Sequence, residues 1–171
     1  LMSGRFFFFF ANAVVFFYDR ASCLRRLDAE LDAINPQLPA DMRDAALISD
    51  PSMIVPVGQG NDLVLPQNIY GAEPTHTWCY FQTKADWAAS KSDWQTAADL
   101  GDIALSQGPL PKEDAMLGAV FVEAFAHVGR WPDALKLSQQ IQQANEGMEP
   151  GLCLLWQRIA RNTPGNAAKS K

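Results

Sequence analysis

Residues 89–97 read ASKSDWQTA and residues 126–134 read AHVGRWPDA, and the two stretches align at an offset of 37 residues. In each, a small residue precedes a short polar turn, a tryptophan follows the turn, and a second small residue comes one helical turn later. Small residues let two antiparallel helices approach closely, and the tryptophan ring covers their connection. Because self-similarity at a fixed period indicates a repeated structural unit, we predict a mainly α-helical protein built from antiparallel helix hairpins.

The apolar pattern on either side of these turns predicts five helices. We expect them at about residues 75–90, 93–107, 112–128, 132–145 and 151–162. The stretch GPLP at residues 108–111 separates two of them, because glycine and proline interrupt helices. A repeat of this length is typical of tetratricopeptide-like hairpins, whose usual period is ~34 residues. Two hairpins and a last capping helix suffice for a compact helical domain.

Composition divides the chain into four regions. They are an apolar membrane-anchor segment at 1–20, an irregular segment that packs on the helices at 21–74, the helical-repeat domain at 75–162, and a flexible polar tail at 163–171. Within the irregular segment, the spacing of apolar residues predicts two short helices, over residues 24–34 and 39–48.

The apolar segment reads FFFFFANAVVFFY over residues 6–18, with Asn12 as its one polar residue. A full membrane span needs ~20 apolar residues, whereas a run of 10–14 is more typical of a core element or a signal peptide. Three interpretations are open. We favour part of a membrane helix; the others are a secretory signal that ends at Ala21-Ser22-Cys23, as in a lipoprotein, and a buried core strand.

The charge balance bears on the class of protein and its partners. Lys and Arg number 14 and Asp and Glu number 19, so the formal net charge is −5. Charged residues make up 19% of the chain, against a typical share of ~25%, which excludes a disordered polyampholyte. Duplex binding rests on clustered Lys and Arg that neutralise phosphates. We therefore expect no nucleic-acid partner.

Sequence motifs for catalysis, cofactors or metals are missing. The chain contains no G-x-x-x-x-G-K-[ST], G-x-G-x-x-G, G-x-S-x-G or H-E-x-x-H. His76 and Cys79 have a ligand-like spacing, but His127 is the only other histidine, and a zinc site needs about four ligands. We expect no metal, no cofactor and no catalytic residue, and favour a non-catalytic chain while leaving the question of enzymatic activity open.

The densest aromatic stretch lies where a turn is expected to lead into the first helix of the repeat domain. Residues 71–81 read GAEPTHTWCYF, and aromatic residues dominate interface hot spots, which favours a recognition surface. The simpler interpretation is that Trp78 and Phe81 belong to the core and that Thr75 or Thr77 caps the helix. The candidates for ligand or partner contact are Arg25, Glu73, His76, Trp78 and Tyr80.

Three stretches share one family resemblance. They are EPTHTWCYF at 73–81 with KAD at 84–86 and DW at 93–94, CLRRLD at 23–28, and LISDPS at 47–52. Together they resemble the soluble C-terminal region of large bacterial polytopic membrane proteins of the dolichyl-phosphate-mannose glycosyltransferase-like type, notably those of filamentous green non-sulfur bacteria. The resemblance covers about residues 14–162, and the Trp-Cys-Tyr-Phe junction is its most specific part.

The resemblance implies a membrane-tethered helical-repeat domain on the extracytoplasmic side of a membrane. The catalytic residues of such proteins lie in their multi-span part, so none is carried over to this chain. The resemblance also implies an oxidising compartment for Cys23 and Cys79, two of the three cysteines. A Cys23–Cys79 disulfide that pins the irregular segment onto the first helix of the domain is therefore implied as well.

Two functions follow as expectations. The first is a non-catalytic accessory or scaffolding module, held at the bilayer by residues 6–18, that binds another protein, above all a membrane protein, in a larger complex. Stacked helix hairpins offer grooves for such partners. The alternative is the extracytoplasmic domain of a lipid-linked-sugar glycosyltransferase that helps position an acceptor; a polar pocket lined by Arg25, Glu73 and Trp78 would favour it. A lipoprotein tethered at Cys23 is a third, weaker interpretation.

Overall fold

Two tight turns, 37 residues apart, set the course of the helical half of the chain. The computed structural model describes residues 13–18, 23–54, 67–71 and 76–163. In it, α3 (Trp78–Ser90) leads after a short turn into α4 (Trp94–Gln107), and α5 (Ala119–His127) leads after a turn of the same length into α6 (Trp131–Ala144). The protein is mainly helical, as the sequence predicts.

The two turns are closed by the same hydrogen bond. The backbone N–H of Asp93 donates to the carbonyl oxygen of Ala88 at 3.0 Å, and the N–H of Arg130 donates to that of Phe125 at 2.8 Å. The residue before each donor has a left-handed backbone, with φ of 60° at Ser92 and 80° at Gly129. Such a residue ends a helix and satisfies its last carbonyl groups. The offset of 37 residues in the sequence therefore corresponds to one repeated device for reversing the chain.

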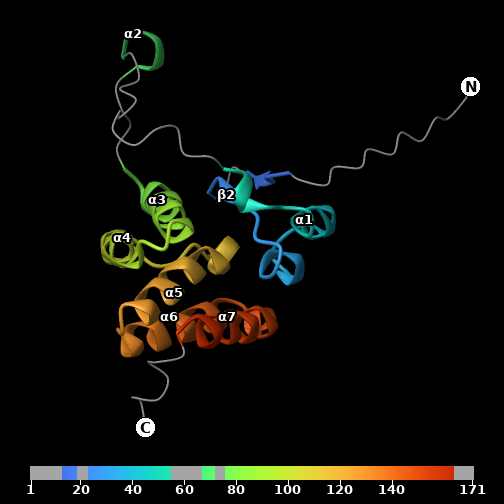
Figure 1. Cartoon of the computed structure of the whole chain (residues 1–171), viewed down its shortest axis with the longest axis vertical. Helices are drawn as coiled ribbons and strands as arrows, with labels where there is room; N and C mark the ends of the chain where they lie inside the picture. The colour runs from blue at the N-terminus through green and yellow to red at the C-terminus, as the bar shows by residue number, and fades with distance from the viewer. Residues whose placement is uncertain (1–12, 19–22, 55–66, 72–75, 164–171) are drawn as a thin grey trace, which may run out of the picture.

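The helices stack on one another and enclose the main core. Figure 1 shows α3 and α4 at one end of the stack, α5 in the middle, and α6 and α7 (Glu149–Asn162) side by side at the other end. The short 3-10 helix η4 (Glu146–Met148) precedes α7. The largest fully buried side chains of this core are Phe121, Phe125, Met116, Leu137, Ile141, Met148, Leu155 and Ile159.

Small residues and one aromatic stack hold the two hairpins together. A Cβ atom at Gly101 of α4 would lie 2.9 Å from the ring of Phe121 of α5, so only glycine lets these helices approach so closely. The Trp94 ring at the start of α4 stacks on His127 at the end of α5, with 3.8 Å between ring centroids. The tryptophan therefore contacts the next hairpin as well as its own.

One predicted helix is broken in the structure. The sequence predicts a single helix over residues 112–128, but residues Lys112–Gly118 form a 3-10 helix, η3, and the α-helix begins only at Ala119. The kink lies at Asp114, whose φ of −150° and ψ of 73° leave the helical region. At this residue the side chain is buried and bonds Arg25, a partner 89 positions away that local sequence spacing does not reveal.

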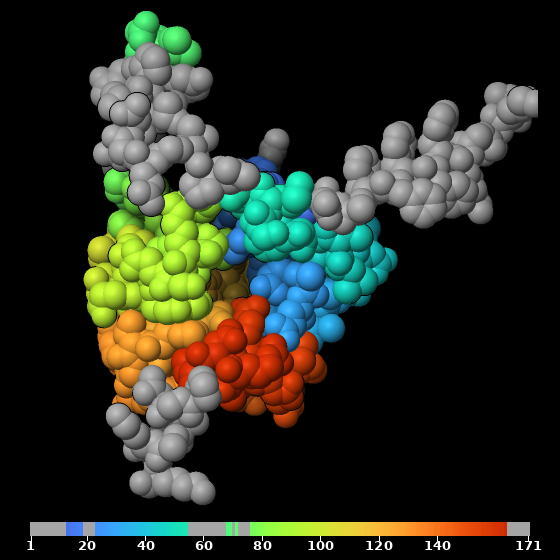
Figure 2. Space-filling view, viewed as in Figure 1, coloured from blue at the N-terminus to red at the C-terminus, as the bar shows by residue number. Residues whose placement is uncertain are grey.

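The N-terminal segment, residues 13–18 and 23–54, packs against the side of the helical stack. Figure 1 shows its blue to teal elements beside the stack, and Figure 2 shows them in contact with both α3 and α7. Its elements are β1 (Phe16–Phe17), which pairs antiparallel with β2 (Arg25–Arg26), then η1 (Asp32–Ile34), α1 (Ala40–Ala46) and η2 (Pro51–Met53). A short helix α2 (Gln67–Tyr70) follows.

The predicted helix over residues 24–34 is wrong, whereas α1 lies within the helix predicted over 39–48. Leu27 of this stretch is fully buried in a second small core with Leu38 and Ala46, away from the main one. The Asp28 carboxylate accepts hydrogen bonds from the backbone N–H groups of Glu30 and Leu31 at 2.8 and 2.9 Å. These side-chain bonds stabilise a turn in competition with helical bonds.

The described part of the apolar run is extended. Within residues 13–18, Phe16 and Phe17 form β1, and Phe16 is 53% exposed while Phe17 packs on the second core. The predicted apolar helix over residues 6–18 is therefore wrong for residues 13–18, and its remaining residues, 6–12, lie outside the described ones. Across the described ranges, no helix combines the length and apolar character that a bilayer crossing needs.

A disulfide ties the N-terminal segment to the stack. Cys23 bonds Cys79 in the first turn of α3, with 5.2 Å between their Cα atoms. This is the pair implied by the family resemblance. Because both sulfurs are used, Cys23 has no thiol free to carry a lipid, which overturns the lipoprotein interpretation. The third cysteine, Cys153, is free and exposed.

A buried arginine makes a second tie. The Arg25 guanidinium donates from Nε to the Asp32 carboxylate at 3.1 Å and from Nη1 to the Asp114 carboxylate at 2.5 Å, and its Nη2 also bonds Asp32. All three residues are buried, Asp32 being 1% and Asp114 3% exposed. Arg25 therefore joins the N-terminal segment to η3 inside the protein.

Replacing both bridged cysteines by serine (Cys23→Ser with Cys79→Ser) is expected to lower the free energy of unfolding by about 4 kcal/mol. The bond spans 56 positions of sequence, and closing a loop of that length restricts the unfolded chain. Urea unfolding measures the difference. Cys153→Ser is the matched control and leaves the midpoint unchanged. Alkylation followed by intact mass gives one modified thiol without reductant and three with it; three modified thiols without reductant would contradict the bond.

The Arg25→Met variant is expected to lose about 3–5 kcal/mol of unfolding free energy at pH 7, because it leaves two buried carboxylates without their cation. Burial already raises the pKa of Asp32 against the opposing attraction of Arg25, and losing Arg25 raises it further. A raised folded-state pKa gives stability that is present below the unfolded value of about 3.9 and is lost as pH rises through the folded value. Urea unfolding at about pH 7 and pH 4.5 should therefore show a smaller deficit at the lower pH. An equal deficit at both would sink this account.

Candidate functional site

The residues predicted for ligand or partner contact do not gather around one cavity. His76, Trp78 and Tyr80 lie at the start of α3, Arg25 lies inside the protein, and Glu73 is outside the described residues. The His76 ring stacks on Tyr80 with 3.7 Å between centroids. Trp78 is half-buried and packs edge-on against Phe121 of the main core. The simpler interpretation of this junction, a helix start that packs on the core, fits Trp78.

Arg25 was expected at an interaction surface, and the structure instead buries it in an ion-pair network. Its side chain is 6% exposed and held by two carboxylates. Because its guanidinium is bonded to two buried carboxylates, Arg25 joins parts of its own chain and is largely shielded from solvent. The sequence gives no sign of this role, since Asp114 is distant along the chain.

A polar hollow of about 370 Å³ lies between the N-terminal segment and the helices, and we name it the ion-pair cleft. Its charged lining residues are Arg25, Arg26, Asp28, Asp32, Asp86, Glu123 and Arg158, a formal balance of 3 − 4 = −1. Across this cleft Arg26 makes two bonds to the Asp86 carboxylate of α3 at 2.8 and 2.9 Å. The cleft therefore shows donors and acceptors of both signs at fixed positions.

Arg158 of α7 is the second hub of the cleft. It bonds Asp28 at 2.7 Å and Glu123 of α5 at 2.8 and 3.2 Å. Burial alone would raise the pKa of Asp28, but Arg158 and two backbone N–H groups outweigh it and hold that pKa below its usual value. Burial raises the pKa of Glu123 despite Arg158, with the nearby acids adding to the shift. Arg158 thus bonds two carboxylates whose pKa values are shifted in opposite directions, that of Asp28 downward and that of Glu123 upward.

One buried acceptor at the cleft is unsatisfied. The Gln82 side chain is 6% exposed, and its Oε1 atom has no hydrogen-bond partner among the described residues. A buried polar atom without a partner is unusual and is often explained by a bound water or ligand. Gln82 belongs to α3 and lines the ion-pair cleft.

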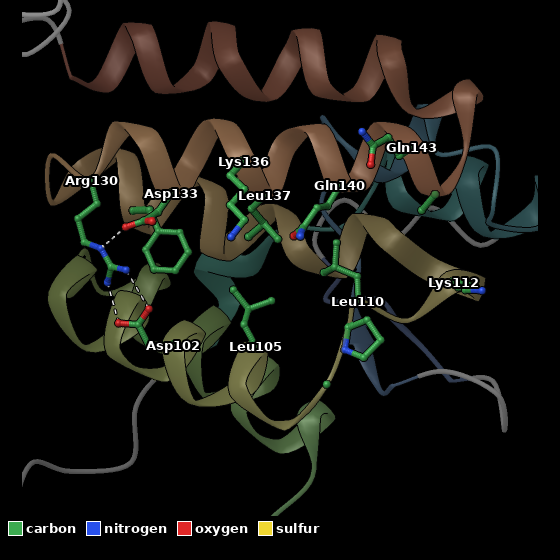
Figure 3. Close-up of a pocket in the computed structure, with 14 residues that line it drawn as sticks. Asp102, Leu105, Leu110, Lys112, Arg130, Asp133, Lys136, Leu137, Gln140 and Gln143 are labelled. Atoms are coloured by element: carbon green, nitrogen blue, oxygen red, sulfur yellow. Dashed lines mark hydrogen bonds and ion pairs between the residues drawn. The ribbon is translucent and has the colours of Figure 1, made fainter.

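A second hollow, of about 450 Å³, lies between α4 and α6, and we name it the α4–α6 groove. Figure 3 shows Lys136 and Leu137 pointing from α6 toward Leu105 of α4, with Leu110 of the connecting loop beside them. The groove thus has an apolar floor and a polar rim. No residue of the N-terminal segment lines the groove.

One end of the α4–α6 groove is closed by charges. Arg130 makes two bonds to Asp102 of α4, at 2.7 and 2.9 Å, and one to Asp133 of α6 at 2.7 Å. Its guanidinium also lies 4.4 Å from the centroid of the Phe125 ring. The hydrogen bonds to Asp102 and Asp133, and the charges of both carboxylates, raise the pKa of the Arg130 guanidinium. Figure 3 shows this cluster as the only network drawn in the groove.

The polar rim of the groove is free to bind. Lys136, Gln140 and Gln143 are exposed along α6, and none has a recorded ion pair or hydrogen bond within the described part of the chain. Side-chain amides donate and accept at once, which suits them to a polypeptide backbone. The sequence stretch KLSQQIQQA at 136–144 is the one signal for this rim, and by itself it looks like any solvated helix face.

The carboxylates of the ion-pair cleft are largely taken up by ion pairs. In the ion-pair cleft, Asp28, Asp86 and Glu123 each bond an arginine, which holds them as ion-pair partners. Within the described ranges, no three His, Cys, Asp or Glu side chains are grouped so as to hold a metal ion. Comparison with protein-family models, with curated proteins and with solved structures gives no match. The geometry of the chain itself is therefore the basis for assigning a function.

Proposed function

We propose that this chain is a non-catalytic, extracytoplasmic helical module that binds a partner protein in the α4–α6 groove and serves as an accessory or scaffolding part of a larger membrane complex. The observation that carries the proposal is the contrast between the two sides of the helical stack. The cleft side is covered by the chain's own N-terminal segment, whereas the groove side is open and has an unpaired polar rim over an apolar floor.

The groove has the size and chemistry for a short protein segment. Its α6 wall runs from Asp133 to Ala144, and the eleven helical steps between them span roughly 17 Å at 1.5 Å per residue. An extended chain covers that length with about five residues. Leu105, Leu110 and Leu137 offer the apolar contact, and the α6 amides offer backbone hydrogen bonds.

The disulfide supports an extracytoplasmic location. Disulfides persist in oxidising compartments and are rare in the cytosol. The tether in a membrane through residues 6–18, and the likeness to glycosyltransferase-like membrane proteins, rest on the sequence and are part of the proposal. The tetratricopeptide-like type of the hairpins is part of the proposal too, and the two equivalent turns at Ser92 and Gly129 support it.

Photo-crosslinking in the native cell tests the proposed groove. A benzoyl-phenylalanine at Gln140, on the groove rim, is expected to give a discrete adduct with one partner, and the same probe at Gln157 of α7 is the matched exposed control. Adding Leu105→Asp to the probe at Gln140 should abolish the adduct, because it places a charge on the apolar floor. Equal labelling from both positions, or none from Gln140, would argue against the groove as an interaction site.

The ion-pair cleft favours a second candidate function, the extracytoplasmic domain of a lipid-linked-sugar glycosyltransferase that positions an acceptor. Of the residues expected around such a pocket, Arg25 lines the cleft, Trp78 does not, and Glu73 is outside the described residues. The cleft is nearly neutral and offers both donors and acceptors, which matches hydroxyl groups better than a charged ligand. The unsatisfied oxygen of Gln82 adds an acceptor.

Titration with methyl glycosides tests this second candidate. It predicts saturable NMR shifts at the backbone amides of Gln82 and Trp94, both of which line the cleft. Asp86→Asn should weaken them, because it removes the partner that orients Arg26. Gln140→Leu, in the other hollow, is the control and leaves them unchanged. Shifts that grow linearly with sugar concentration in all three proteins would eliminate the candidate.

A further inference from the structure

The exposed apolar side chains are concentrated in the N-terminal segment. Of ten large hydrophobic side chains exposed in the described part of the chain, seven belong to residues 13–54. They are Phe16, Tyr18, Leu24, Ile34, Leu47, Ile48 and Met53. Single exposed apolar residues are ordinary, but a contiguous group marks an interaction site. A buried role for Phe16 and Leu24 is excluded, since they are 53% and 50% exposed.

Two members of this group, Phe16 and Leu24, line one hollow together with two half-buried apolar residues. Phe16 of β1, Leu24 before β2, Ile54 after η2 and Trp87 of α3 line a single hollow of about 440 Å³. We name these four residues the β-ribbon patch. They come from three stretches of the chain that the fold brings together, so the patch exists only in the folded protein.

The rim of the β-ribbon patch is positive, although the whole chain carries −5. Lys84 lines the hollow and lies 5.5 Å from the centroid of the Tyr80 ring, and Lys91 lies 4.2 Å from that of Trp87. Neither lysine has a recorded ion pair among the described residues. The remaining charges at the hollow, Arg26 and Asp86, neutralise each other. The net charge offered at the patch is thus cationic.

We propose that the β-ribbon patch lies on the surface of a bilayer with anionic headgroups and is a second membrane contact of this domain. Apolar side chains with aromatic rings and lysines at the rim are the combination that binds at a lipid interface. Lysine ammonium groups near an anionic surface add attraction, while their aliphatic stems cover apolar surface. The proposal rests on the proposed tether for its placement, because the apolar residues 6–12 precede residues 13–16 directly in the chain.

This contact would orient the domain. The patch is built from the β-ribbon, residue 54 and α3, whereas the α4–α6 groove is built from α4, the loop after it, α5 and α6. No residue lines both hollows. A domain lying on its β-ribbon patch therefore keeps the groove free for a partner.

Vesicle co-sedimentation of the full chain tests the proposal, with vesicles of three parts phosphatidylcholine to one part phosphatidylglycerol. Residues 6–10, all phenylalanine, are first replaced by serine, so that residual binding reports on the folded surface. Leu24→Asp in this background is expected to reduce the bound fraction about tenfold. Leu135→Asp on α6 is the matched control, since Leu135 is 52% exposed, and it is expected to change binding less than twofold. Circular dichroism shows that both variants are folded.

The charge of the lipid separates the outcomes. Binding of the serine-substituted chain should fall in pure phosphatidylcholine vesicles and in the Lys84→Glu variant. Equal loss in Leu24→Asp and Leu135→Asp, or no residual binding of the serine-substituted chain, overturns the patch as a membrane contact. The tether is tested separately in the chain that keeps its native residues 6–10 and carries only Leu24→Asp. If the tether binds the bilayer, this chain sediments with vesicles. In the serine-substituted background, a Leu24→Asp chain that binds vesicles as well as the Leu135→Asp chain overturns the proposal.

Discussion

The buried Arg25 guanidinium, held between Asp32 and Asp114, is the constraint on which the arrangement of the two parts of this protein depends. Asp32 belongs to the same N-terminal segment as Arg25, and Asp114 to the helical stack, so one side chain fixes both at once. A buried cation is tolerated only with partners of this kind. The same bond explains why η3 is a 3-10 helix with a kink, since the Asp114 backbone leaves the helical region where its side chain turns to Arg25. The Cys23–Cys79 disulfide, formed two residues before Arg25, bonds the same part of the segment to the start of α3.

The position of the N-terminal segment decides which faces of the helices can bind anything else. Ion pairs of Arg26 with Asp86 and of Arg158 with Asp28 tie the segment to α3 and α7, and Glu123 brings in α5. The face made by α3, α5 and α7 is thereby occupied by the chain itself, apart from the ion-pair cleft. The α4–α6 groove, in contrast, is lined by no residue of the segment. The N-terminal segment thus covers one face of the helices, which favours the α4–α6 groove as the proposed site for a partner protein.

Local signals in the sequence were enough to predict α3, α4, α6 and α7, whereas the helix predicted over residues 112–128 is an α-helix only from Ala119. The repeated tryptophan and the glycine at position 129 mark a turn whose hydrogen bonds are all local, so the helices could be placed within a few residues. The N-terminal segment could not be predicted in this way, because Arg25 and Leu27 are set by contacts far along the chain or in another core. The candidate functional sites also depend on contacts between residues that are distant in the sequence. The disulfide was reached only through a family resemblance, and the α4–α6 groove needs two helices side by side before its glutamines differ from any solvated helix face.

The basic residues divide between two tasks, and this division links the fold to the proposed surfaces. All six described arginines make recorded hydrogen bonds within the chain, five of them to carboxylates and Arg43 to the Leu38 carbonyl. The four described lysines, at positions 84, 91, 112 and 136, have no recorded ion pair within those ranges. A planar guanidinium suits fixed pairs, whereas a lysine is a mobile, well-hydrated charge on a flexible stem. Among the described residues, the positive charge without an ion pair inside the chain is therefore carried by lysines, and two of them lie at the β-ribbon patch and two at the α4–α6 groove. The described arginines therefore stabilise the fold, whereas the lysines carry the positive charge at the two proposed binding surfaces.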